Sequence, residues 1–168
     1  MEIKDLLERL KNDKKFKDWK KKNEKSFLAH VFKCLDDSNI DEWQIGFYNK
    51  DDTITTFTLT PSEITSGSSD EVFKRPDARI LELDEGKIKI DITNALETAE
   101  KIQNTEYKQE IPFKIIAILQ RLDIGQIYNI TYVTQSFNIL NFKIDSCTGK
   151  LLKKTLTPLM EFRKKEKG

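Results

Sequence analysis

Four apolar, strand-like runs follow one another between residues 113 and 156, and only short turns separate them. Such turns can join only antiparallel neighbours, because a parallel connection needs a crossover of a dozen residues or more. This part of the chain therefore predicts an antiparallel meander with turns at Asp123–Gly125 and Ser146–Gly149 and an end at Pro158. The four predicted strands are Phe113–Leu122, Gln126–Thr134, Phe137–Asp145 and Lys150–Leu156.

The first 60 residues show a similar order of elements. Residues 3–22 carry apolar side chains at helical spacing and predict one amphipathic helix. Residues 26–35 form a nearly continuous apolar run, whose aromatic and β-branched content favours a buried strand, with a short amphipathic helix as the alternative. After a turn at residues 36–41, residues 43–48 and 53–59 have the composition of a β-hairpin.

The segment between the two halves has the composition of an acidic linker, which we place at residues 61–90. Within it, Ser62–Pro76 predicts a surface loop, and residues 80–83 predict a short strand or an extended segment. A second helix begins after a cap at Asp91 or Thr93 and ends near Gln103. Its predicted core-facing residues are Ala95, Leu96, Ala99 and Ile102.

These elements predict an α+β fold in which helices pack on one face of antiparallel β-meander sheets. We expect a single domain over residues 1–168, made of a helix-plus-meander unit at 1–60, a second at 91–157 and a basic tail at 158–168. The pairs Leu35-Asp36 and Leu122-Asp123 lie about 87 positions apart and suggest a weak internal duplication. The alternative is that any helix followed by a meander would show the same order.

The second unit closes on a run that reads Phe-Lys-Ile-Asp-Ser-Cys-Thr-Gly-Lys-Leu, residues 142–151. In its turn, Asp145 can accept hydrogen bonds from the amides two and three residues on. Thr148 suits the bridge conformation, and Gly149 can supply the positive φ of a hairpin closed by a bulge.

Together with the small residues of the preceding helix, this order resembles the PepSY domain over roughly residues 91–157. The resemblance implies a helix followed by a meander, and an inhibitory or chaperoning contact with a partner protein. If the first unit is a diverged copy, the chain resembles a tandem PepSY-like protein of intracellular type.

Charge is strongly segregated along a chain whose net charge is only +1. Residues 1–25 carry ten basic and six acidic residues, residues 36–100 six basic and sixteen acidic, and residues 150–168 seven basic and two acidic. The basic ends could meet nucleic acid or an anionic membrane surface. However, acids interleave the lysines and no aromatic-basic stacking motif occurs. We therefore expect the basic ends to pair with the acidic middle or with a partner.

No residue pattern points to catalysis, a metal or a cofactor. His30 and Cys34 would lie about 13 Å apart on one strand, although they would be neighbours on a helix. The acidic pairs fall in predicted turns, where carboxylates bind their own backbone. Cys34 and Cys147 belong to no Cys/His cluster. We predict a protein that is not an enzyme and has no cofactor.

The remaining signal is a set of aromatic and amide residues on the predicted strands, which could surround an exposed groove on the second face of the sheet. Strand register decides which of them share that face. The sequence thus predicts a non-enzymatic, cytoplasmic binding or regulatory protein that contacts a protein or peptide through its sheet and does not enter a membrane. The alternatives are a homo-oligomeric structural protein and a nucleic-acid-binding protein. The candidate binding residues are Trp43, Tyr48, Gln120, Asn129 and Asn141.

Overall fold

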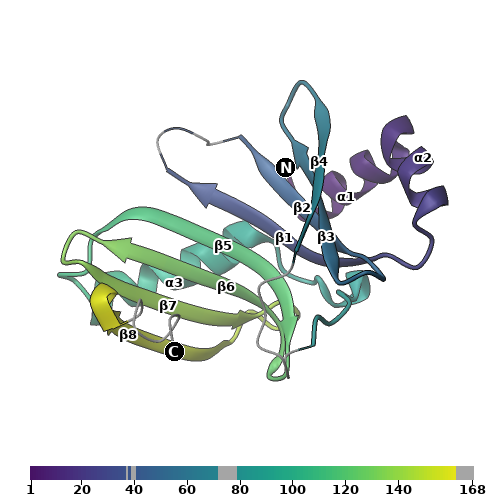
Figure 1. The fold of residues 1–168 in the computed structure, drawn as a ribbon. Coiled ribbons are helices and arrows are strands. Elements are labelled where there is room, and N and C mark those ends of the chain that lie inside the picture. Colours follow the sequence, from purple (N-terminus) through teal and green to yellow (C-terminus); the bar gives the residue numbers. More distant parts are fainter. Residues whose placement is uncertain (37, 39–40, 72–78, 162–168) are drawn as a thin grey trace.

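One antiparallel sheet organises the chain (Figure 1). The computed structural model describes residues 1–36, 38, 41–71 and 79–161. Within these residues eight strands pair in the order β4-β3-β2-β1-β5-β6-β7-β8. Each half is a four-stranded meander, and the pairing of β1 with β5 joins the two halves into one sheet. The strands are β1 (Phe27–Leu35), β2 (Trp43–Tyr48), β3 (Thr53–Leu59), β4 (Ile64–Glu71), β5 (Pro112–Leu122), β6 (Gly125–Thr134), β7 (Asn138–Asp145) and β8 (Leu151–Pro158).

The helices α1 (Ile3–Asn12), α2 (Lys14–Lys22) and α3 (Ile92–Glu106) cover one face of this sheet. Figure 1 shows α3 passing behind β5–β7, with α1 and α2 beside the first meander. Buried residues of all three helices and of both meanders form one hydrophobic cluster. The predicted α+β fold with helices on an antiparallel sheet is therefore confirmed. The duplication remains a prediction, although a helical segment followed by a four-stranded meander occurs twice in the element order.

The alternative that residues 26–35 form a helix is wrong, because β1 is a strand paired on both sides. Val31 lies opposite Ile45 of β2 and opposite Leu119 of β5. A strand with neighbours on both sides satisfies its backbone groups in the sheet, so its side chains can be apolar over most of its length. This explains the nearly continuous apolar run in the sequence.

The prediction of one helix over residues 3–22 is also wrong, because the helix is interrupted at Asp13 and continues as a separate helix, α2. The backbone of Asp13 is extended, with φ −68° and ψ 136°, and its side chain accepts a hydrogen bond from the amide of Phe16 at 3.0 Å. Asp favours this capping position over a helix interior. The break lets α2 turn so that the Phe16 ring packs 5.1 Å from Phe47 and 5.2 Å from Phe57.

The predicted surface loop at Ser62–Pro76 is wrong in its first part, where β4 pairs with β3. The sequence of β4 is rich in Ser, Thr and Gly and carries little strand propensity of its own, so its pairing depends on the neighbouring strand. Residues 72–76 lie outside the described residues, as do residues 162–168 of the basic tail predicted at 158–168; Pro158 of that predicted tail is the last residue of β8.

The segment at residues 79–91 is extended rather than a strand, and it is tied to both halves of the sheet. The amide of Leu83 donates to the carbonyl of Leu28 at 2.9 Å, and the Tyr128 hydroxyl donates to the carbonyl of Ile90 at 2.7 Å. A short 3-10 turn, η1 (Glu85–Lys87), interrupts it. At its end, the Asp91 carboxylate accepts a hydrogen bond from the amide of Ile3 at 3.2 Å, which links the starts of α1 and α3.

We predict that Phe137→Gly stabilises the protein. Phe137 lies between β6 and β7 with φ 57°, in the left-handed region that L side chains adopt at a cost, while its side chain is 73% exposed and contributes little packing. The free energy of unfolding should rise by about 0.5–1 kcal/mol in urea titrations, the relief of strain exceeding the entropy cost of glycine. Phe137→Ser removes the same ring but keeps a Cβ atom, and it should bring no gain. Equal shifts for both variants would contradict the strain argument.

Candidate functional site

The candidate site lies on the face of the sheet opposite the helices, which we call the open face. No helix among the described residues lies across it. Strand alternation and register place Gln120 of β5, Asn129 of β6 and Asn141 of β7 there, and Tyr48 of β2 shares the face. All four of these predicted side chains are partly buried.

The prediction that Trp43 is a binding residue on the exposed face of the sheet is wrong, because its side chain lies on the helix face. It is 8% exposed and belongs to the hydrophobic core. The ammonium of Lys33 stands 4.3 Å from the centre of its ring, and burial lowers the pKa of Lys33 while Asp41 acts in the opposite direction. Trp43 thus packs on the helix face beside the Lys33 ammonium and cannot reach a partner on the open face.

A ladder of polar side chains crosses β6 and β7 on the open face. The Asn141 amide nitrogen donates to the Asn129 side-chain oxygen at 2.7 Å and to the Thr131 hydroxyl at 2.9 Å. The Lys143 ammonium in turn donates to the Asn141 side-chain oxygen at 2.9 Å. Partial burial, with Lys153 directly opposite on β8, lowers the pKa of Lys143. These contacts fix the side chains in defined orientations before any partner arrives.

Apolar side chains lie beside this ladder, where the two meanders join. Phe32 of β1 faces Ile118 of β5, and Cys34 faces Ile116. All four are only partly buried. The open face therefore combines an apolar strip with an ordered polar strip, which is the mixture found at protein-binding surfaces.

Tyr48 is not part of this cluster. Its ring packs against Phe27 with 5.3 Å between centres, and its hydroxyl contacts Asp52. Three strand-to-strand steps, or roughly 14 Å, separate β2 from β6. The structure therefore brings Asn129 and Asn141 together and places Gln120 one strand away, while Tyr48 lies apart on the same face.

His30 also lies on this face, and sequence analysis considered it only as a partner of Cys34. Its ring lies over Gly46 of β2, where a Cβ atom would stand 2.8 Å from Nδ1 and nearer still to Cε1 and Nε2. Gly46 thus supplies the space that the imidazole fills, and burial lowers the pKa of His30 from its ordinary value of 6.5. A glycine on a strand opposite a bulky ring was the signal available in the sequence.

The predicted structural turn has the expected contacts. The Asp145 carboxylate accepts hydrogen bonds from the amides of Cys147 at 2.8 Å and Thr148 at 2.7 Å. Slight burial acts against ionisation, but the amides of Thr148 and Cys147 hold the pKa of Asp145 below its usual range. Gly149 has φ 75°, which fits the bulged hairpin.

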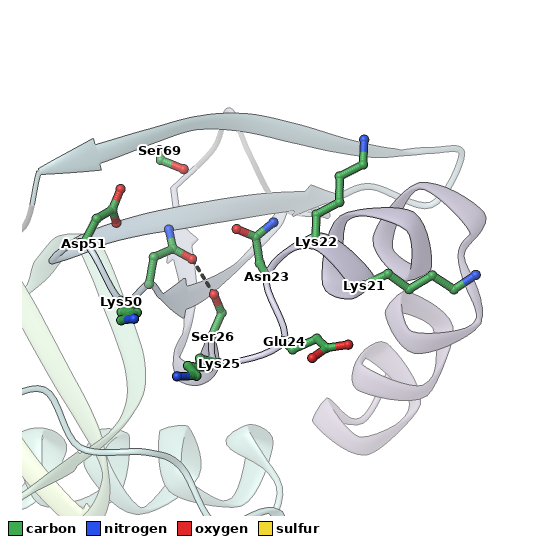
Figure 2. A pocket seen from close by; sticks show the side chains of 10 residues that line it. Lys21, Lys22, Asn23, Glu24, Lys25, Ser26, Lys50, Asp51 and Ser69 are labelled. Atoms are coloured by element: carbon green, nitrogen blue, oxygen red, sulfur yellow. Dashed lines mark hydrogen bonds between the residues drawn. The ribbon is translucent and has the colours of Figure 1, made fainter.

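The two larger cavities of the described residues lie outside the open face and were not found from the sequence. One, of about 350 Å³, lies where the end of α2 meets the β2–β3 turn (Figure 2). The Ser26 hydroxyl donates to the Asn49 side chain at 2.7 Å, and the Asn49 amide nitrogen donates to Thr55 at 2.9 Å. Figure 2 shows Lys21 and Lys22 pointing away from this network, so the lysines do not converge on a ligand position. The second cavity is a groove beside α2.

The described part of the chain has neither a cluster of metal-ligating side chains nor a membrane-spanning helix. No group of three or more His, Cys, Asp or Glu side chains there could hold a metal ion. Nor does any helix in those ranges have the length and apolar character needed to cross a membrane.

Comparison with known proteins gives the fold but no family. No protein-family model matches the chain, and no curated protein matches it. Among solved structures, the crystal structure of a putative lipoprotein from Clostridium difficile 630 is similar, with a TM-score of 0.56 and 17% sequence identity. The similarity covers 84% of this chain and 90% of the other. At that identity the match shows a shared small α+β fold alone.

We predict that Gly46→Ala destabilises the protein through His30. The new methyl group would displace the ring, at a cost of about 1–3 kcal/mol. In a His30→Ala background the same change should cost little, so a double-mutant cycle in urea should give a coupling of about 1–2 kcal/mol. Additive effects would show that the ring does not occupy this space.

We predict that His30 makes the stability of the protein depend on pH. Its pKa is lower in the folded state, so the unfolded chain takes up the proton first as the pH falls. Stability should therefore fall below about pH 6.5 and level off below the folded pKa. His30→Phe keeps a ring over Gly46 but cannot titrate, and urea titrations from about pH 7.5 to 5 should show a smaller loss. Parallel losses in the two proteins would exclude His30 as the source.

Proposed function

We propose that this chain is a non-enzymatic binding protein that works in the cytoplasm and contacts a protein or peptide partner through the open face of its sheet. The observation that carries the proposal is the ladder of Asn129, Asn141 and Lys143, ordered by its own hydrogen bonds beside a partly buried apolar strip. Ordered side chains lose little conformational entropy on binding, so more of the contact energy remains available as affinity.

The chemistry of the face suits a polypeptide partner. Phe32, Ile116 and Ile118 offer apolar contact across the joint between the meanders. The amides beside them can both donate and accept, which matches the alternating groups of a peptide backbone. A surface with both features favours a protein or peptide over a purely anionic ligand.

The two side chains closest to a catalytic pair support a non-enzymatic role. The Cys34 thiol donates to the Asp36 carboxylate at 3.5 Å. Burial, followed by this hydrogen bond, raises the pKa of Cys34 and so disfavours the reactive thiolate. His30 lies four residues away on the same strand, about 13 Å by strand geometry, which is too far for proton transfer.

We also propose that residues 91–157 form a PepSY-like unit. In its support, α3 buries Ala95 and Ala99 against the second meander, and the meander closes on the Asp145 turn. The first half repeats the order of helical segment and four strands. A tandem of PepSY-like units would fit a role in contacting another protein.

A homo-oligomeric protein is the second candidate, and exposed apolar side chains at one end of the sheet favour it. Hydrogen bonds bring the three segments that carry them together: Gln135 donates to Ile111, and Leu159 donates to Phe137. A concentration of large exposed apolar groups marks a contact surface more often than chance exposure does. The exposed residues are Ile111, Phe113, Phe137 and Met160.

We predict that Thr131→Arg abolishes partner binding. Thr131 lies within the polar ladder, so a bulky cation there would obstruct the open face. The chain of residues 1–168, immobilised, should recover one or a few proteins from native lysate at near-stoichiometric level, and Thr131→Arg should lose them. Thr65→Arg is the matched control, because the same change on the edge strand β4 lies five strands, or roughly 24 Å, away. Circular dichroism should show that both variants are folded.

Recovery of the same proteins by Thr131→Arg, or of none by the wild type, would contradict the proposal. Light scattering over a range of concentrations separates the two candidates. A monomer at all concentrations favours a partner on the open face, whereas a stable dimer favours self-association.

A further inference from the structure

A groove of about 660 Å³ lies beside α2, on the helix side of the sheet. Its floor is apolar and comes from three parts of the chain: Phe16 of α2, Leu28 and Phe47 of the sheet, and Leu83 of the extended segment. The hydrogen bond from Leu83 to the carbonyl of Leu28 holds the two sides of this floor together. Sequence analysis gave no sign of the groove, because its floor assembles only when α2 turns at Asp13.

The floor is continuous with an aromatic cluster that keeps its shape. The ring of Phe16 lies 5.1 Å from Phe47, and both rings contact Trp19 at 5.7 and 5.5 Å. Packed rings of this kind have little freedom to collapse into the open space. The groove is therefore a formed cavity, and its volume falls in the range typical of small-molecule sites.

The rim of the groove is charged, with lysines on the wall formed by α2. Lys17 and Lys21 both line the groove and lie one helical turn apart, on the same side of α2. Lys20 also lines the groove, and its ammonium donates to the backbone carbonyls of Asn23 at 3.4 Å, Glu24 at 3.0 Å and Ser26. This places a third positive charge at the edge of the apolar floor.

Acidic groups also line the rim, and their positions decide where its net positive charge lies. Glu85 is neutralised by Lys11, with 2.6 Å between the charged atoms, and this ion pair bridges α1 and the η1 turn. Glu82 lies across the groove from α2, and Glu24 lies just beyond the end of that helix. The positive charge is thus concentrated along the α2 wall.

We propose that this groove binds a single-chain amphiphile with an anionic head group, such as a medium-chain fatty acid. The apolar chain would lie on the floor over Phe47 and Leu83, and the head group would meet Lys17 and Lys21. Size and charge argue for this occupant: the cavity holds a small molecule, and its cationic wall complements an anion. The site is separate from the open face, so it can exist whether or not the proposed function is correct.

The test uses decanoate, kept below its micelle concentration, and isothermal titration calorimetry on the chain of residues 1–168. Decanoate should bind with one-to-one stoichiometry, and decyltrimethylammonium, which has the same chain with a cationic head, should bind more weakly. The double variant Lys17→Gln/Lys21→Gln should weaken decanoate binding roughly 3- to 10-fold, the range expected for two solvent-exposed charge contacts. Glu82→Gln should strengthen it, because it removes a negative charge from the opposite rim.

The double variant Lys14→Gln/Lys15→Gln is the matched control. It removes the same charge from α2 at positions that do not line the groove, and its affinity should equal that of the wild type. Amide chemical shifts of the wild type give a readout that needs no variant. Decanoate should shift the signals of Phe27, Leu28, Phe47 and Leu83, while those of Asn129 and Asn141 on the open face stay unchanged.

Four results would overturn the proposal: no binding of decanoate, equal binding of the cationic and anionic probes, the same loss in both double variants, or shifts confined to the open face. A parallel binding experiment with vesicles of anionic phospholipid tests whether the lysines contact a membrane surface instead. Binding to vesicles without binding to monomeric decanoate would assign the lysines to a membrane surface and refute a site for a single chain.

Discussion

The pairing of β1 with β5 is the interaction on which the rest of the structure depends. It aligns residues 30–35 with residues 115–120 and turns two four-stranded meanders into one sheet. Each meander alone would expose a long strand edge with unpaired backbone groups. When the halves are joined, the backbone groups of the two edges form hydrogen bonds with each other, and the apolar strip of Phe32 and Ile118 forms across the joint. The apolar part of the candidate binding face therefore exists only because the halves are joined in this register.

The two faces of the sheet have different physical roles. On the helix face, residues from both meanders are buried against α1, α2 and α3 in one hydrophobic cluster, which provides most of the burial that stabilises the fold. The open face contributes partly buried residues whose polar groups bond to one another, such as Asn129 with Asn141. Because stability rests mainly on the first face, side chains on the second are freer to serve recognition.

Much of the fold could be predicted because local pattern and tertiary contact agree. Short turns between strong strand formers specified the second meander, and the Asp145 turn followed from side-chain chemistry alone. The errors came where tertiary contacts decide. Asp13 breaks a periodic helix because the aromatic rings beyond it pack on the sheet, and β4 is a strand only because β3 offers an edge. Trp43 was assigned to the wrong face because alternation gives two sets of residues and only packing selects between them. The α2 groove could not be foreseen, since its floor is drawn from three distant segments.

The two edge strands have a consequence for the behaviour of the protein in a crowded solution. An open sheet ends in two strands whose outer backbone groups can template the addition of further chains. Here β4 carries mostly Ser, Thr and Gly with acidic residues at its end, and β8 carries adjacent lysines at 153 and 154. Strands that are weakly apolar or positively charged make poor partners for stacking into fibrils. The same composition that hid β4 from sequence analysis thus protects the sheet from growing by edge-to-edge polymerisation.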